Sequence, residues 1–167
     1  MGVVETLAER NAEFAKTLFN PGLTIRPRLA TLVIGCVDTR VDPTYLFGAQ
    51  QGEIMAIRNV GGRVTPGALE DLAALDKVSR DGFDSWELIV MQHTQCGITR
   101  LQDQPDVLAS YFRISEDEVP GMFVADPWAA VTRDVAALRE DPRLGRARIS
   151  GLVYDVTTGL VETVVKP

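Results

Sequence analysis

Continuous apolar runs, without polar alternation, mark the strands expected in this chain. The clearest run is Leu-Ala-Thr-Leu-Val-Ile-Gly at 29–35, which ends at Cys36. Such a run is typical of a strand buried on both faces, as in a parallel sheet. Strands are expected at 29–35, 53–59, 86–91, 149–156 and 160–165. The sequence Thr-Thr-Gly at 157–159 suits a turn, so the last strand is expected to run back along the one before it.

Apolar residues at helical spacing predict helices between these strands. The expected helices cover 3–19, 66–80, 105–112 and 127–140. Asn-Pro-Gly at 20–22 would end the first helix, and Asp-Gly at 81–82 the second. Thr65 offers an N-cap, followed by Pro66 at the first helical position. The stretch between the last two helices contains Pro120 and Gly121 and is expected to be a loop.

Strands that alternate with helices predict an α/β fold. We expect a mainly parallel central β-sheet flanked by helices, with an antiparallel C-terminal strand. The length suits one domain, so residues 1–167 are interpreted as a single domain with an N-terminal helical arm at 1–22. The first helix is amphipathic, and it would pack either on its own domain or on a partner subunit. The sequence leaves these two alternatives open.

Composition and charge narrow the classes of protein. Hydrophobic residues make up 46% of the 167 positions, enough to bury a core. No stretch approaches the roughly 18 consecutive apolar residues of a membrane span, and the N-terminus lacks the layout of a signal peptide. We therefore expect a cytoplasmic protein without a membrane partner. The net charge of −6 argues against a nucleic-acid partner, which would need a basic surface.

Two cysteines and one histidine are the only soft metal ligands in the sequence. Cys36 and His93 come just after the two best strand candidates, and His93-Thr94-Gln95-Cys96 lets two ligands turn back on one ion. In an open α/β sheet the carboxyl ends of the strands border the ligand crevice. Three ligands with one exchangeable position are typical of catalytic zinc. Plain packing of buried cysteines and a redox cysteine pair stay open as alternatives.

Three motifs together resemble the β-class carbonic anhydrases. The sequence Cys-Val-Asp-Thr-Arg at 36–40 resembles the Cys-x-Asp-Ser/Thr-Arg signature of that family. His-Thr-Gln-Cys-Gly at 93–97 is similar to its His-x-x-Cys-Gly signature, and Arg-Asn-Val-Gly-Gly at 58–62 to the segment between them. The resemblance covers residues 29–101, and the short length is similar to that of the compact bacterial members.

The resemblance implies a fold, a reaction and a set of roles. It implies a homodimer or larger homo-oligomer that acts on a small molecule, as a lyase. The reaction is zinc-dependent, reversible hydration of carbon dioxide to bicarbonate by a zinc-bound hydroxide. One Zn²⁺ per chain would be held by Cys36, His93 and Cys96. Asp38 would accept a hydrogen bond from the hydroxide or enter as fourth metal ligand, and Arg40 would pair with Asp38 and hold it off the metal.

The neighbouring residues give weaker indications. Gly61 and Gly62 are candidates for the substrate pocket, since glycine lets backbone approach closely, although a simple turn is an equal alternative. Arg58 and Asn59 are interpreted as structural. Asp42 and Asp103 are interpreted as solvated loop acids. Candidates for pocket lining that remain unassigned are Tyr45, Phe47, Gln50 and Gln51.

Two departures from the family pattern bear on the chemistry, and the sequence does not separate linear substrates that differ by sulfur for oxygen. Gln95 stands where several relatives carry Asp, and no second histidine is present to shuttle protons. Hydrolysis of carbonyl sulfide or carbon disulfide at the same zinc site is one alternative. A zinc-binding interaction protein without catalysis is another.

Overall fold

The computed structural model describes residues 2–79 and 84–167. Its strands are β1 (Thr31–Cys36), β2 (Ile54–Asn59), β3 (Glu87–His93), β4 (Arg148–Asp155) and β5 (Leu160–Val165). Its α-helices are α1 (Val3–Thr17), α2 (Pro43–Leu46), α3 (Pro66–Val78), α4 (Pro105–Phe112) and α5 (Pro127–Glu140). Its 3₁₀ helices are η1 (Gly97–Leu101), η2 (Glu116–Met122) and η3 (Pro142–Leu144).

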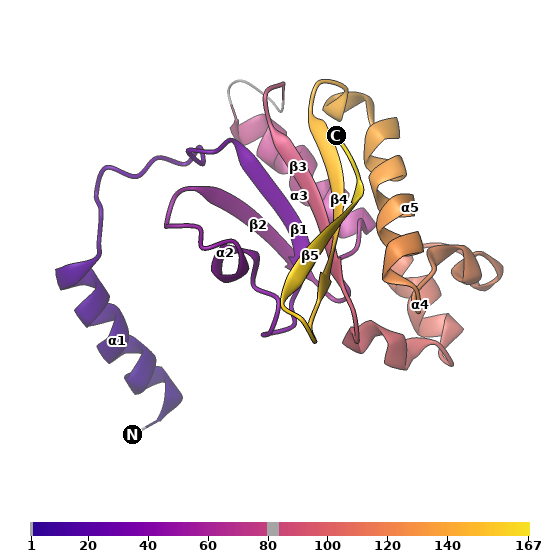
Figure 1. The fold of residues 1–167 in the computed structure, drawn as a ribbon, viewed down its shortest axis with the longest axis horizontal. Coiled ribbons are helices and arrows are strands. Elements are labelled where there is room, and N and C mark those ends of the chain that lie inside the picture. Colours follow the sequence, from indigo (N-terminus) through magenta and orange to yellow (C-terminus); the bar gives the residue numbers. More distant parts are fainter. Residues whose placement is uncertain (1, 80–83) are drawn as a thin grey trace.

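A five-stranded sheet in the order β2-β1-β3-β4-β5 forms the centre of the fold (Figure 1). The first four strands of that order are parallel, and β5 pairs antiparallel with β4. The predicted fold class is confirmed. Because β1 and β3 are neighbours, Cys36 and His93 emerge from adjacent strands at the same edge of the sheet.

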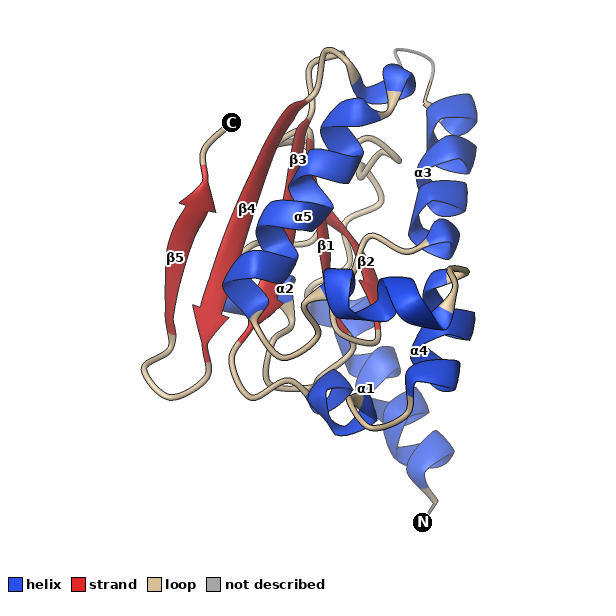
Figure 2. Ribbon diagram, turned by 90° about the vertical axis from the view of Figure 1, so that its right-hand side faces the viewer, coloured by secondary structure: helices blue, strands red, loops and turns tan. Residues whose placement is uncertain are grey.

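One face of the sheet carries the main core, because helices α3 and α5 pack against it (Figure 2). Apolar residues of β1, β3 and β4 meet Leu72 of α3 and Val131, Val135 and Leu138 of α5. A second apolar cluster lies beyond the carboxyl ends of the strands, where α4 and η2 pack around Cys36 and Cys96. Both cysteines are therefore members of the second cluster.

Three local predictions differ from the structure. The first helix ends at Thr17, two residues before the expected end. The segment expected to be a loop contains η2, whose N-cap Ser115 and Glu118 form a capping box, and Pro120 is tolerated in this short 3₁₀ turn. The pattern did not indicate α2, where the Asp42 carboxylate caps the amides of Thr44 and Tyr45. The expected end of the second helix at 80–82 lies outside the described residues.

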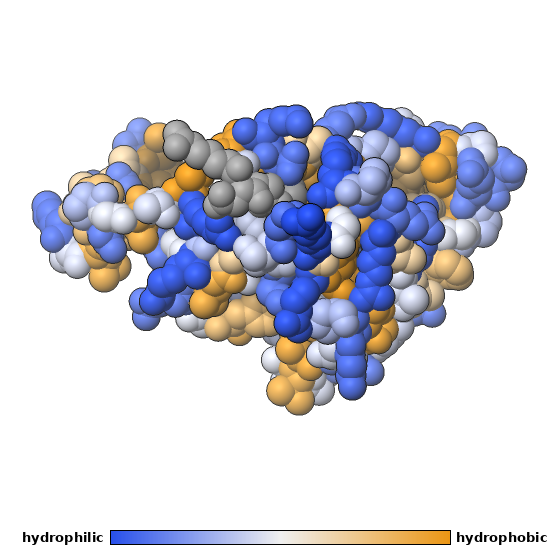
Figure 3. Space-filling model, turned by 90° about the horizontal axis from the view of Figure 1, so that it is seen from above, coloured by the Kyte–Doolittle hydropathy of each residue, from blue (hydrophilic) through white to orange (hydrophobic). Residues whose placement is uncertain are grey.

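Helix α1 projects away from the sheet (Figure 1) and has no buried residue. In the space-filling view, the arm at the left-hand end shows apolar residues open to solvent between hydrophilic ones (Figure 3). Of the two alternatives for this helix, packing on its own domain is wrong. Within the described residues, no helix combines the length and the apolar character needed to cross a membrane. The single domain and the cytoplasmic location stay predictions.

Candidate metal centre

Cys36, His93 and Cys96 converge beyond the ends of β1 and β3. Their candidate ligand atoms all lie within 4.8 Å of one another, and all three residues are buried. Cys36 is the last residue of β1 and His93 the last of β3, while Cys96 is the N-cap of η1. The sheet register thus brings together three residues that are up to 60 positions apart.

The two ring nitrogens of His93 have different surroundings, and only Nε2 is available to a metal ion. His93 Nδ1 lies 2.9 Å from the carbonyl oxygen of Thr94, and because a carbonyl only accepts, Nδ1 carries the proton. The other nitrogen, Nε2, is then an unprotonated acceptor. It is buried and has no hydrogen-bond partner among the described residues. A buried nitrogen lone pair that faces two sulfurs is unfavourable unless a cation occupies the space between them, so these residues fit a metal ion.

The two cysteines favour metal binding over a disulfide. Their Sγ atoms are 3.7 Å apart, well beyond a disulfide bond length of about 2.05 Å. The hydrogen bond from Cys96 lowers the pKa of Cys36, and backbone amides such as that of Asp38 add to the effect. The pKa of Cys96 is raised, because it donates to the Cys36 sulfur and is buried. The lowered pKa favours the thiolate form of Cys36, and a bound cation would also favour the thiolate form of Cys96.

Asp38 and Arg40 form a two-point ion pair close in sequence to the ligand Cys36. The carboxylate accepts from Arg40 Nε at 3.0 Å and Nη2 at 2.7 Å, and from the Arg40 amide at 2.9 Å. The fork geometry holds the pKa of Asp38 well below its usual range, so the group stays ionised. Arg40 Nη2 also donates to the Gln95 carbonyl at 3.1 Å. In this arrangement Asp38 pairs with Arg40 and is not part of the three-ligand cluster.

Gln95 reaches this position through unusual backbone. Its φ is +54°, a left-handed conformation that is uncommon for a residue with a side chain. The conformation aims its carbonyl at Arg40, while its side-chain amide donates to Thr157 Oγ1 at 3.2 Å. Gln95 is therefore engaged through both backbone and side chain.

Arg58 supports the backbone around the site, as expected for a structural residue. It donates to the carbonyl of Cys36 at 2.8 Å and to that of Asp38 at 2.7 Å, and it pairs with Asp42 at 2.8 Å. Asp42 is a loop acid with a 43% exposed side chain, as expected, and it also pairs with Arg58 and caps α2. Asp103 is exposed, as expected.

Gly61 and Gly62 form a tight turn, and Gly62 packs against the backbone of Cys36. Their φ values are +84° and +63°. A Cβ on Gly62 would lie 2.9 Å from both the Cys36 nitrogen and the Met91 oxygen, and one on Gly61 would lie 2.7 Å from Ile98 Cδ1. This close approach, and the turn that creates it, require glycine at both positions. A substrate-binding role for these two residues stays a prediction.

The unassigned pocket candidates lie along other cavities. Phe47 borders an apolar groove of about 280 Å³ over the β1 and β3 side of the sheet, and Tyr45 is exposed. Gln50 and Gln51 border a polar hollow next to the linker that follows α1. None of these four residues shares a described pocket with Cys36, His93 or Cys96.

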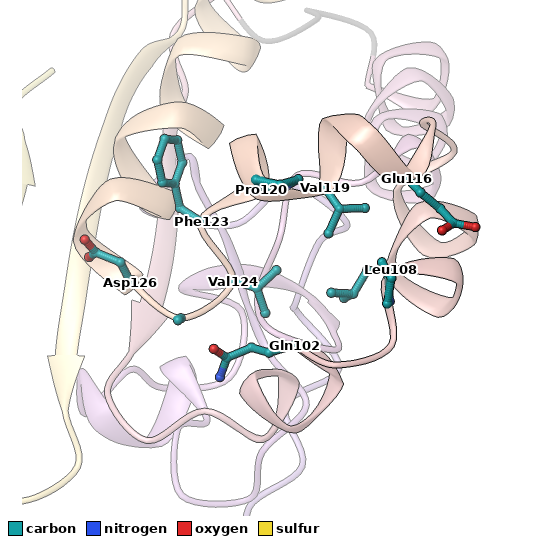
Figure 4. Close-up of a pocket in the computed structure, with 10 residues that line it drawn as sticks. Gln102, Leu108, Glu116, Val119, Pro120, Phe123, Val124 and Asp126 are labelled. Atoms are coloured by element: carbon teal, nitrogen blue, oxygen red, sulfur yellow. The ribbon is translucent and has the colours of Figure 1, made fainter.

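A separate apolar pocket of about 380 Å³ lies between α4 and η2 (Figure 4). Its inner wall includes Leu108 and Val119, which belong to the cluster that packs on Cys36 and Cys96. Glu116 and Asp126 stand at its rim, and Asp126 already caps α5. The three candidate ligands do not line this pocket, although Cys36 and Cys96 share an apolar cluster with Leu108 and Val119.

Sequence reasoning missed two buried charged residues close to the site, Arg63 and Asp134. Arg63 directly follows the two glycines, and Asp134 lies on α5 and contacts Gln92, the residue before His93. A signal for Asp134 was present, because it occupies the apolar stripe of its helix together with Val131, Val135 and Leu138. A carboxylate in such a stripe requires a buried partner.

Known proteins that are similar to this chain point to one family. Residues 31–117 match the family model described as Carbonic anhydrase. Beta-carbonic anhydrase 1 of Mycobacterium tuberculosis is 27% identical over 176 residues, which cover 98% of this chain and 99% of that protein. A carbon disulfide hydrolase of an Acidianus species is 29% identical, covering 75% of this chain and 72% of the relative.

Solved structures agree with the sequence relatives. The carbonic anhydrase of Streptococcus mutans superimposes with a TM-score of 0.75 at 25% identity, covering 98% of each chain. The family match spans both cysteines and the histidine. The chain therefore belongs to the carbonic anhydrase family, and to its β class.

Proposed function

We propose that this chain catalyses the reversible hydration of carbon dioxide to bicarbonate, with one zinc ion held by Cys36, His93 and Cys96. The observation that carries the proposal is the buried cluster of two sulfurs and one unpartnered imidazole nitrogen, next to the Asp38–Arg40 pair, in a member of this family. When bound there, zinc would lower the pKa of a water molecule and so supply a nucleophile at neutral pH.

The protein's own residues would orient this chemistry. Asp38 stays ionised, so it offers a carboxylate oxygen that can accept a hydrogen bond from the attacking water and aim it. Arg40 fixes the carboxylate through its two-point contact. Apolar side chains of the second cluster, among them Val41, Ile98 and Leu108, surround the cysteines and suit a small apolar substrate.

Proton removal must rely on solvent, because the only imidazole in the sequence is His93 and it is assigned to the metal. The proton released by hydration would leave through water to a buffer molecule. We therefore expect turnover to rise with buffer concentration at constant pH and ionic strength.

The direct test is stopped-flow hydration of carbon dioxide by zinc-loaded protein, with metal-depleted protein as the control. We expect a zinc-dependent rate. The relatives named carbon disulfide hydrolases make carbon disulfide the second substrate to assay, with release of hydrogen sulfide as the signal. Hydrolysis without hydration would reassign the substrate. Full zinc content without either activity would favour a non-catalytic zinc protein.

A second copy of the chain is the partner proposed for the N-terminal arm. Val3, Val4 and Leu7 of α1 are more than half exposed. The apolar groove bordered by Val33, Ile89 and other residues lies on the sheet face opposite α3 and α5, and would accept such a helix. Reciprocal exchange of the arms would give a homodimer.

Sedimentation velocity tests this assembly. Wild type should sediment as a dimer or larger species at micromolar concentration. Replacing Val4 and Leu7 together by Asp should shift it toward monomer, while Glu9→Gln on the polar side should not. A wild-type monomer would refute the proposed dimer.

A further inference from the structure

A buried ion pair lies beside the metal centre. Arg63 is 1% exposed and Asp134 is 0% exposed. The guanidinium donates through Nε to one carboxylate oxygen at 2.7 Å and through Nη2 to the other at 3.1 Å. The two residues are 71 positions apart in sequence, so only the tertiary fold brings them together.

Asp134 collects donors from three separate elements. Besides Arg63, it accepts from the Val64 amide at 3.0 Å, from Gln92 Nε2 on β3 at 3.1 Å and from Arg133 on its own helix at 3.3 Å. On the other side of the pair, the Arg63 guanidinium lies 4.9 Å from the centre of the Phe112 ring, within cation–π range. The carboxylate therefore ties α5 to both segments that lead into the ligands.

The first of these segments presses on Cys36. Asn59 clamps the loop by accepting from the Arg63 amide at 2.8 Å and donating to the Arg63 carbonyl at 2.7 Å. Inside this clamp, Gly62 lies against the backbone of Cys36 and Met91. A shift of Arg63 would therefore move the backbone that contacts a ligand.

The second segment ends at His93. Gln92 directly precedes this residue, and its amide donor is fixed on Asp134. Both ligand-bearing strands are thus tied to one carboxylate: β1 through the glycine loop, and β3 through Gln92.

A buried ion pair at this position is not expected to stabilise the fold more than apolar residues would. Both charges lose their hydration on burial, and apolar residues of similar volume commonly stabilise a core as well or better. The pair does offer directional contacts at fixed angles, which apolar packing cannot provide.

We propose that Arg63 and Asp134 are positioning residues of the metal centre. They hold the glycine loop and the end of β3 so that Cys36 and His93 meet on the same ion. This inference rests on the proposed zinc site, and it adds two residues that do not themselves touch metal or substrate.

Three variants separate positioning from bulk stability. Asp134→Asn keeps the shape but leaves the Arg63 charge buried without its counter-charge. The double variant Arg63→Met with Asp134→Leu removes both charges and restores an apolar fill. Leu138→Ala, one turn further along α5 in the main core, is the control: it creates a cavity without touching the network.

Zinc release into a chromophoric chelator is the main readout, since it does not require turnover. It is measured well below the unfolding midpoint of every variant, and carbon dioxide hydration is measured in parallel. Asp134→Asn and the double variant should both release zinc about 10- to 100-fold faster than wild type, the usual effect of removing a group that supports a metal ligand. The double variant should release zinc this fast even though its unfolding midpoint is higher than that of Asp134→Asn. Leu138→Ala should have a lowered midpoint and wild-type zinc release.

Two results would overturn the inference. One is wild-type zinc release in the double variant, which would make the pair a purely structural feature. The other is equally fast release in Leu138→Ala, which would attribute the effect to stability. If wild type holds zinc but does not hydrate carbon dioxide, the proposed function fails while zinc release still tests the positioning role.

Discussion

Replacing Asp38 by Asn separates a working enzyme from a protein that merely binds zinc. The substitution keeps the shape of the side chain and removes its charge. It also places an amide donor opposite Arg40, where the carboxylate now accepts from Nε, Nη2 and the backbone amide. The acceptor that would aim the attacking water is thereby weakened, while Cys36, His93 and Cys96 are unchanged.

The magnitude follows from the loss of one oriented polar group. Removing such a group costs on the order of 2–4 kcal/mol in the transition state. At about 1.36 kcal/mol for each factor of ten, this is a roughly 30- to 1,000-fold drop in turnover. Zinc content should stay near the wild-type value, because three ligands remain.

The sequence offers a matched control for this change. Asp141 and Arg143 repeat the arrangement of Asp38 and Arg40: the carboxylate of the first residue accepts from the amide and the guanidinium of the residue two positions later. Asp141→Asn, at the end of α5, should leave turnover unchanged. The measurement is stopped-flow hydration with metal analysis of each preparation. Wild-type turnover in Asp38→Asn would refute the role given to this carboxylate.

Three further outcomes are expected. Cys96→Ser should lose zinc and activity together, and full zinc occupancy by metal analysis would exclude Cys96 as a ligand. Gly62→Ala places a Cβ 2.9 Å from backbone atoms of β1 and β3 at a φ of +63°, so chemical denaturation should show a loss of about 1–3 kcal/mol; Gly121→Ala, with open space around it, is the control. The Arg143 guanidinium lowers the pKa of Asp141. The pair therefore contributes fully to the free energy of unfolding above the unfolded pKa of about 3.9, and this contribution is lost as the pH falls below that value. The free energy of unfolding of wild type should exceed that of Asp141→Asn by at most about 1 kcal/mol near neutral pH, and chemical denaturation in acid should show a smaller difference.

Much of the fold followed from local pattern. The apolar run before Cys36 predicted β1, and the Thr-Thr-Gly turn at 157–159 predicted that β5 runs back along β4. The 3₁₀ turn η2 was missed because Pro120 and Gly121 oppose long helices but not a short turn with a good cap. The short helix α2 was missed because four residues are too few to show a helical period.

The candidate site was predictable to the extent that its residues are close in sequence. Cys36, Asp38 and Arg40 form one motif, and His93 and Cys96 another, so each half was visible by itself. Arg63 was not visible, because nothing in its Gly-Gly-Arg-Val context indicates burial. Its partner Asp134 was recognisable as a charged residue in the apolar stripe of a helix, but the sequence does not indicate which residue it pairs with.

By itself the sequence determined the order of the five strands and the four longer helices along the chain, the buried faces, and the residue types able to hold a metal, because these depend on neighbours within a few positions. Only the tertiary structure decided that β1 and β3 lie side by side, that Gly62 presses on Cys36, and that Asp134 meets Arg63. It also decided that α1 finds no place on its own sheet. The physical reason is that hydrophobic periodicity specifies which face is buried but not what it is buried against, and partners distant in sequence are chosen by packing and burial of charge.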